Sequence, residues 1–290
     1  MTPLDAIVLA HHAPALKSDA ANCAAFLLLV LSFCGKTELM MPNQDTIILI
    51  PARHAATRLP GKPLADIAGK PMIQHVWERA IEADMGPVIV ATDEAEIAAC
   101  IESVGGIAIL TESDLPSGSD RIAVALQAYD PEGKFQSVIN LQGDLPDLNP
   151  NAITILAELL HTGHYEMTTL VAPASEAEIA RPQVVKAAIA WHDTARAGIR
   201  TGDALYFSRA AIPTGDAPKW HHIGLYGWQR DALMQFINLP PSELEQSEKL
   251  EQLRALEAGM KIGVGLLETA PGGVDTKEDL EAARQRMAKG

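Results

Sequence analysis

Cysteine is scarce in this chain, which has three in 290 residues. Cys23 and Cys34 lie near the N-terminus, and Cys100 stands alone in the rest of the sequence. This pattern excludes a disulfide framework and a zinc site of ordinary spacing. It is typical of a protein from a reducing compartment, so we expect a cytoplasmic location.

Basic residues are also few: 23 Lys and Arg stand against 37 Asp and Glu, which gives a formal net charge of −14. Nucleic acids and anionic membranes are bound by basic surfaces, so we expect neither as a partner. Any anionic ligand must therefore be held by a local group of basic residues.

The apolar run at 24–34 is far shorter than the about 20 residues of a membrane-spanning helix. The residues before it lack the positive charge of a signal peptide. We expect residues 1–44 to be a non-core N-terminal extension, either disordered or upstream of a true start at Met40 or Met41. A targeting segment is the third alternative. The folded domain is expected at 45–290.

A basic, glycine-containing loop follows the first predicted strand. Residues 46–50 are apolar or β-branched, as in a strand buried on both faces of a parallel sheet, and Pro51 ends it. Gly61 lets the loop backbone approach an anion closely. The loop carries three cations and two stiffening prolines: Arg53, Arg58, Lys62, Pro60 and Pro63. Such a loop suits a triphosphate, and a solvated basic loop that closes a βα unit is the alternative.

Strands and amphipathic helices alternate after this loop. Strands are predicted at 46–50, 87–92, 107–110 and 137–141, with helices between them and at 150–161. The fold class is therefore α/β, with a doubly wound, mostly parallel sheet and a ligand beyond the carboxyl ends of its strands. Further strands at 167–172, 184–190 and 204–207, with a turn at 201–203, predict a smaller mixed-sheet lobe at about 165–228. A helix at about 244–258, a strand at 261–267 and a helix at 276–288 return the chain to the main sheet.

Short motifs occur in a fixed order along the chain, beginning with PAR-x3-TRLPGKPL after the first strand. The others are ATD at 91–93, SGSDR at 117–121, NLQGD at 140–144, ALYFSRA at 204–210, HHIGLYG at 221–227, EKLEQLRALEAG at 248–259 and GVDTKEDLE at 273–281. From residue 45 onward the chain resembles the sugar-activating cytidylyltransferases, and most closely the 3-deoxy-manno-octulosonate cytidylyltransferase (CMP-Kdo synthetase) family. The resemblance implies a nucleotide-diphospho-sugar transferase-like fold. It also implies a homodimer formed through the smaller lobe, and Mg²⁺-dependent transfer of CMP from CTP to an acidic eight-carbon sugar, Kdo.

The same resemblance assigns roles to individual residues. It implies that Asp144 and Asp275 hold Mg²⁺ and that Lys62 acts with them in catalysis. For CTP it implies Pro51, Ala52, Arg53, Arg58, Lys62, Thr92, Asp93, Ser117, Gly118 and Arg121. For the sugar it implies Gln142, Arg209, His222, Tyr226, Glu251 and Gln252, and His221 is expected to matter less than His222.

Structural alternatives exist for several of these side chains. Asp144 could begin a turn, Asp275 could cap the last helix, and Arg121 could be an exposed helix arginine. Ala56 and Leu145 depart from the serine and glutamate that are common in the family, which removes one possible phosphate hydrogen bond and one acidic side chain beside the metal. Other acidic sugars, 8-amino-Kdo or an acylneuraminate, are alternative substrates, and a non-catalytic nucleotide-binding regulator is the alternative from another class.

Overall fold

The structure is a computed structural model that describes residues 45–53, 59–193 and 199–288, and the statements below concern these residues. The predicted extension at 1–44, the predicted phosphate ligand Arg58 and the departure at Ala56 lie outside the described residues. Among the described helices, none combines the length and the apolar character needed to cross a membrane.

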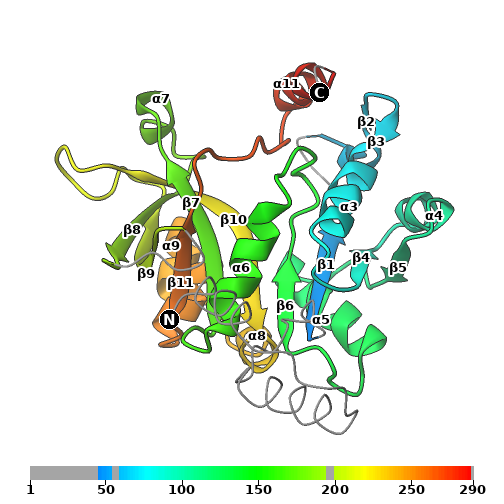
Figure 1. Cartoon of the computed structure of the whole chain (residues 1–290), viewed down its shortest axis with the longest axis horizontal. Coiled ribbons are helices and arrows are strands. Elements are labelled where there is room, and N and C mark those ends of the chain that lie inside the picture. Colours follow the sequence, from blue (N-terminus) through cyan, green and yellow to red (C-terminus); the bar gives the residue numbers. More distant parts are fainter. Residues whose placement is uncertain (1–44, 54–58, 194–198, 289–290) are drawn as a thin grey trace, which may run out of the picture. The chain divides into compact units, whose positions relative to one another are not determined.

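Four parallel strands form the first half of the main sheet (Figure 1). β1 (Thr46–Ala52) lies between β4 (Val88–Thr92) and β6 (Ser137–Asn140), and β5 (Ile107–Leu110) is the edge strand beyond β4. The continuous apolar runs predicted these strands correctly. β1, β4 and β6 are buried, because a parallel strand with helices on both sides has no solvent face, whereas the edge strand β5 is partly exposed.

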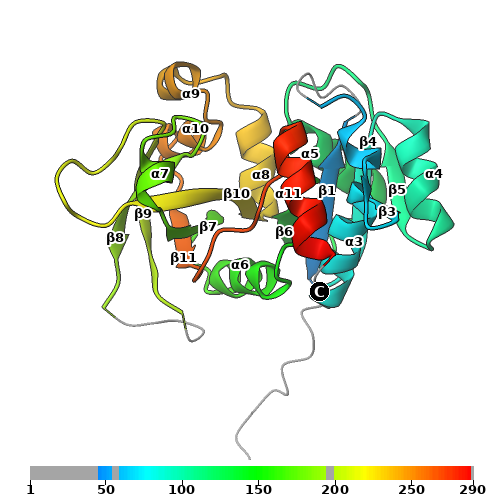
Figure 2. The same cartoon turned by 90° about the horizontal axis from the view of Figure 1, so that it is seen from above.

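Alternate residues of β1 face two separate cores. Ile48 and Ile50 pack with α3 (Met72–Glu82), α4 (Ala95–Ser103) and α6 (Asn151–His161). On the other face Ile47 and Leu49 share a core with α5 (Gly118–Tyr129) and α8 (Arg230–Ile237). Figure 2 shows α6 and α8 on opposite sides of the sheet. The predicted doubly wound α/β fold is confirmed.

The second half of the sheet is mixed and closes on itself. β10 (Trp220–Gln229) runs antiparallel between β6 and β7 (Met167–Pro173). β11 (Ile262–Leu266) is parallel to β7, and β9 (Thr201–Ser208) and β8 (Lys186–Trp191) follow it. β8 also pairs with the first residues of β10. The predicted mixed pairing is present, but these strands continue the main nine-stranded sheet and do not form a separate one.

Two local predictions in this half were wrong, and one strand was missed. The turn predicted at 201–203 is the start of β9, where a Cβ on Gly202 would come within 2.6 Å of the carbonyl oxygen of Ala190. Gly202 therefore permits close strand packing instead of a turn. The helix predicted at 244–258 is two helices, α9 (Glu243–Glu248) and α10 (Gln252–Glu257), because Lys249 adopts a left-handed conformation with φ of 57°. Strand β10 was not predicted, since its glycines and histidines hide the apolar pattern.

The last helix brings the C-terminal region against the basic loop. α11 (Lys277–Met287) packs on β2 (Asp66–Ile67), which pairs with β3 (Lys70–Pro71), as Figure 1 shows. Their shared core contains Leu59 and Ile67 from the loop region and Val274 and Leu280 from the C-terminal segment. Two short helices complete the described elements, η2 (Lys62–Leu64) and α7 (Glu176–Ile179). Because of this packing, residues next to α11 reach the carboxyl ends of β1 and β6.

Candidate active site

The carboxyl ends of β1 and β6 lie side by side and form the floor of the candidate site. β1 ends at Ala52 and β6 is followed by Gln142, Gly143 and Asp144. A Cβ on Gly143 would lie 3.0 Å from the carbonyl oxygen of Pro51. Glycine therefore lets the segment after β6 cross close to the end of β1.

Lys62 joins the two aspartates that the sequence predicted as metal ligands. Its Nζ lies 2.9 Å from Asp144 Oδ2 and 2.9 Å from Asp275 Oδ1. Burial by itself lowers the pKa of Lys62, but attraction and hydrogen bonding to the two carboxylates outweigh it and hold the pKa above its ordinary value. Lys62 is therefore a cation at neutral pH, placed between two carboxylates that come from distant parts of the chain.

Local structure fixes both aspartates. Asp275 precedes α11, whose N-cap is Thr276, and Thr276 forms a capping box with Asp279. The alternative that Asp275 caps this helix is therefore wrong, because Thr276 has that role. The backbone N–H of Val274 donates to the carbonyl oxygen of Asp144 at 3.0 Å. This bond ties the two aspartate-bearing segments together.

Two cavities meet at the end of β1. The first, about 230 Å³, is lined by Lys62, Asp144 and Asp275 with Leu59, Pro63 and Gly143. The second, about 330 Å³, is lined by Ser117, Gly118, Arg121 and Glu251 with Leu115 and Pro116. Pro51, Ala52, Arg53 and Gln142 line both cavities. The cavities therefore form one continuous cleft, and it brings together predicted CTP, metal and sugar residues.

Arg121 is buried in the wall of the second cavity, so the alternative of an exposed helix arginine is wrong. Its guanidinium pairs with Asp93 at 3.2 Å and donates to the hydroxyl of Thr111. The N–H of Glu94 donates to the hydroxyl of Thr92. Arg121 therefore lines the second cavity. Asp93 and Thr92 are absent from the linings of both cavities and form contacts within the protein at the carboxyl end of β4.

Glu251 is the acidic residue of the second cavity. The break between α9 and α10 places it at the N-terminus of α10, where it accepts a hydrogen bond from Ser119 at 3.1 Å. Burial raises the pKa of Glu251, and the bond from Ser119 only partly offsets this.

The other predicted sugar residues form a buried network behind this cavity. The Tyr226 hydroxyl donates to Gln252 Oε1 at 3.2 Å, and Gln252 Nε2 lies 3.4 Å from His222 Nδ1. Burial lowers the pKa of His222 to about 3 and raises that of Tyr226, so both side chains are neutral at pH 7. Their sugar contacts stay predictions.

Arg209 lies apart from the two cavities described above. Its guanidinium donates to the carbonyl oxygens of Pro182, Glu248 and Lys249, at the C-terminus of α9. His221 pairs with Glu178 at 3.1 Å, whereas His222 faces the buried network. The sugar role of Arg209 stays a prediction, and the structure gives it a clear role in holding α9.

Comparison with known proteins identifies the family. Residues 47–262 match the family model described as Cytidylyltransferase. A 3-deoxy-manno-octulosonate cytidylyltransferase of Methylobacterium radiotolerans is 54% identical over 83% of this chain and 96% of its own length. One of Paramagnetospirillum magneticum is 52% identical over 84% of this chain and 98% of its own length.

This chain belongs to the cytidylyltransferase family. A solved structure of CMP:2-keto-3-deoxy-manno-octonic acid synthetase complexed with CTP is 40% identical, covers 85% of this chain and 99% of that chain, and superposes with a TM-score of 0.76. A cytidylyltransferase from Leptospira borgpetersenii, 16% identical with a TM-score of 0.56, has the same fold.

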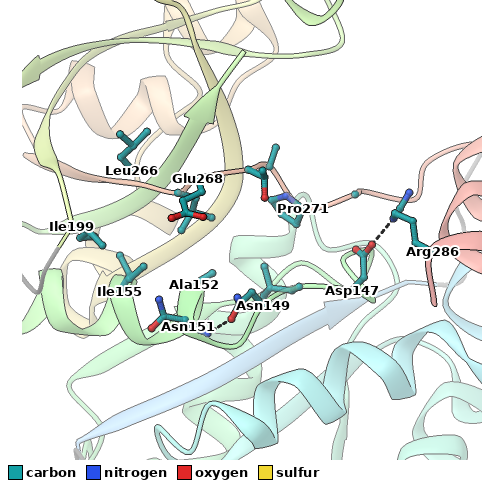
Figure 3. A pocket seen from close by; sticks show the side chains of 15 residues that line it. Asp147, Asn149, Asn151, Ala152, Ile155, Ile199, Leu266, Glu268, Pro271 and Arg286 are labelled. Carbon is teal, nitrogen blue, oxygen red and sulfur yellow. Dashed lines mark hydrogen bonds and ion pairs between the residues drawn. The ribbon is translucent and has the colours of Figure 1, made fainter. Parts of the chain in front are cut away.

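A third cavity, about 560 Å³, lies behind the aspartate-bearing segments of this cytidylyltransferase (Figure 3). It is bounded by residues 147–152 on one side and 266–272 on the other, and none of the predicted site residues lines it. In Figure 3 Arg286 reaches Asp147, and the Nε to Oδ2 distance is 2.6 Å. This pair joins α11 to the segment after β6, and so adds a second link between the regions that carry Asp275 and Asp144.

One buried polar contact of the cytidylyltransferase was missed in the sequence. Thr169 is fully buried in β7 and lies 3.0 Å from His222 Nε2. The available signal was a pair of threonines, Thr168 and Thr169, in an otherwise apolar strand. A buried hydroxyl needs a partner, so such a position indicates a polar contact across the sheet.

The buried state of His222 predicts a pH dependence of stability. Its pKa is about 3 in the folded protein against an ordinary 6.5, so below pH 6.5 the unfolded chain binds the extra proton and folding stability falls. The slope is about 1.4 kcal/mol per pH unit. Between pH 7 and pH 5 we therefore expect the free energy of unfolding of the wild type to fall by about 2 kcal/mol more than that of His222→Gln. Urea unfolding of both proteins at the two pH values measures this, and equal losses would contradict it.

Proposed function

We propose that this protein transfers CMP from CTP to the anomeric hydroxyl of 3-deoxy-manno-octulosonate, giving CMP-Kdo and pyrophosphate. The observation that carries the proposal is the cluster of Lys62, Asp144 and Asp275 in the cleft beyond β1 and β6, in a chain of the cytidylyltransferase family. Open α/β sheets bind their ligands at this edge. The reaction is the activation step for the inner core of lipopolysaccharide.

The two cavities divide the substrates between them. The first has the cations and carboxylates that suit a triphosphate with its metal. The second has Ser117, Gly118 and Arg121 for the nucleoside and Glu251 for the sugar. Arg53 and Gln142 line both cavities, so the sugar hydroxyl and the α-phosphorus of CTP meet beside them. In the reaction a bond forms from the sugar oxygen to this phosphorus and the bond to the β-phosphate breaks, which releases pyrophosphate.

The carboxylates fit a magnesium ion. Asp144 Oδ2 and Asp275 Oδ1 each lie 2.9 Å from Lys62 Nζ, so these two oxygens are less than twice that distance apart. Among the described residues, no group of three or more His, Cys, Asp or Glu side chains could hold a metal ion. Mg²⁺ commonly takes one or two carboxylates and completes its shell with phosphate oxygens and water. When bound, it would neutralise triphosphate charge and orient the α-phosphate for attack.

Lys62 changes partners in this scheme. Its ammonium group pairs with both aspartates. A triphosphate in the first cavity offers a stronger anionic partner, so we expect the Lys62 side chain to turn to the phosphates and to leave the two carboxylates for the metal. Arg53, which is exposed at the junction of the cavities, is placed to hold the phosphates as well.

The alternatives differ in ways that one experiment separates. Cytidylyltransferases for 8-amino-Kdo or an acylneuraminate need the same CTP residues and a different sugar pocket. A non-catalytic regulator has no need of paired metal carboxylates, and Asp144 and Asp275 are brought together here. Pyrophosphate release should be measured with CTP, Mg²⁺ and each of Kdo, 8-amino-Kdo and N-acetylneuraminate. We expect Kdo to give the highest kcat/KM, and an absence of release with all three sugars would disprove the proposed function.

We also propose that the enzyme acts in the cytoplasm as a homodimer that uses its outer strands. The scarcity of cysteine supports the cytoplasmic location.

The exposure of Leu205 supports the dimer. This side chain of β9 is 62% exposed, as expected of an apolar side chain at a subunit contact. Sedimentation equilibrium of the wild type and Leu205→Glu tests the dimer, and an unchanged mass in the variant would place the contact elsewhere.

A further inference from the structure

The Thr169 hydroxyl connects β7 to an irregular part of β10. Its oxygen lies 3.0 Å from His222 Nε2, 3.1 Å from the carbonyl oxygen of Ile223 and 2.9 Å from that of Leu225. The pairing of β10 with β7 shifts register here: Ile223 pairs with Leu170, and the next pair is Tyr226 with Thr169. The chain between them leaves the ladder, so its carbonyl groups need another donor, and the Thr169 hydroxyl is that donor.

The hydrogen bonds of this network can run in only one direction. Carbonyl oxygens accept, so the single Thr169 hydrogen goes to the bulge and the Thr169 oxygen accepts from His222 Nε2–H. In a neutral ring Nδ1 then carries no hydrogen and accepts from Gln252 Nε2. This sets the Gln252 amide so that its Oε1 accepts from Tyr226. The His222 and Phe207 rings also pack edge to face, with ring centroids 4.6 Å apart, which limits rotation of the His222 ring.

We propose that Thr169 is a positioning residue of the sugar site: its hydroxyl holds the β10 bulge and the Nε2-protonated form of His222, and through His222 it orients Gln252 and Tyr226. The proposal rests on the proposed function, because these three side chains are predicted sugar residues. Glu251, which lines the second cavity, directly precedes Gln252 at the start of α10. A misplaced Gln252 amide therefore disturbs the wall of the sugar pocket. Of the described residues that line the triphosphate cavity around Lys62, none belongs to the network.

The chain provides a matched control. Thr168 is fully buried in the same strand, and its hydroxyl donates to the carbonyl oxygen of Leu156 in α6, on the opposite face of the sheet. Thr169→Val and Thr168→Val each replace a hydroxyl with a methyl group of similar size in the same strand. Thr169→Ser keeps the hydroxyl and removes only the methyl group.

The first measurement is the ¹⁵N spectrum of the histidine rings, with His222 assigned by its loss in His222→Gln. In the wild type and in Thr168→Val we expect the neutral, Nε2-protonated form from pH 7 to pH 5. In Thr169→Val we expect a mixture of the two neutral forms, because Nε2–H has lost its acceptor. Thr169→Ser should restore the wild-type signals. An unchanged His222 spectrum in Thr169→Val would overturn the proposal.

The second measurement is the steady-state kinetics of the same proteins with CTP and Kdo. Thr169→Val should raise the KM for Kdo about tenfold, as the loss of one well-placed buried hydrogen bond implies, and should change the KM for CTP less than about twofold. An equal rise in Thr168→Val, or no rise in Thr169→Val, would overturn the role of Thr169 in the sugar site. If the wild type does not turn over, the proposed function fails, and the ring spectra still decide whether Thr169 sets the state of His222.

Discussion

Asp144→Asn and Asp275→Asn should each lower turnover by at least about a hundredfold, since a metal in such a site supplies several kcal/mol of charge stabilisation. Each change keeps the size of the side chain and removes one of the two carboxylates that meet at Lys62. Asn is a weaker ligand for Mg²⁺ because its amide oxygen carries no full charge. Stopped assays with CTP and Kdo at low millimolar Mg²⁺ measure the loss.

Stability should change little in both variants. The Asp144 side chain is 30% exposed and that of Asp275 is 56% exposed, so each ion pair with Lys62 is screened and contributes about 0–1 kcal/mol. Asp147→Asn is the matched control: Asp147 follows Asp144 in the same segment but pairs with Arg286 and lines the third cavity. The Asp147→Asn variant should keep its turnover within a few-fold of the wild type. Near-normal turnover in Asp144→Asn or Asp275→Asn would show that the carboxylate does not hold the metal.

Lys62→Met should change the affinities for nucleotide and metal in opposite directions. Loss of a charge-assisted hydrogen bond to the triphosphate should weaken CTP binding by about 10- to 100-fold, and less at high salt. Loss of the same ammonium group leaves two carboxylates facing each other without their cation, so Mn²⁺ binding in the absence of CTP should become about tenfold tighter. Calorimetry with CTP, and electron paramagnetic resonance of free Mn²⁺, measure the two effects separately.

Lys70→Met separates this effect from a general loss of positive charge. Lys70 pairs with Glu78 on the surface, at 2.8 Å, and lies outside the two cleft cavities. The Lys70→Met variant should bind CTP and Mn²⁺ with affinities near those of the wild type. If Lys62→Met bound Mn²⁺ no more tightly than the wild type, the idea that the Lys62 ammonium group competes with the metal for Asp144 and Asp275 would be wrong. If CTP affinity were also unchanged, the loop would have a structural role only.

The sequence by itself determined the first half of the fold. The apolar runs that form β1, β4 and β6 have no solvent face, and this pattern depends only on the residues of each strand and the helices next to it in the chain. It also determined the character of the loop at 51–63, because proline, glycine and closely spaced cations act over a few residues. The order of motifs was sufficient to predict the family, and the comparisons confirm it.

Tertiary structure decided how distant residues meet. Lys62 and Asp275 are 213 residues apart, and only the packing of α11 on the loop region makes them neighbours. Gly202 belongs to a strand and not to a turn because another strand, β8, needs space there. Arg121 is buried and pairs with Asp93, and His222 is buried with Thr169 and Gln252 as its partners. Contacts of this kind depend on the surroundings of a side chain, which no local pattern contains. The sequence therefore proposed residues for the site, whereas the fold decided which of those in the described ranges line the cleft and which lie behind or apart from it.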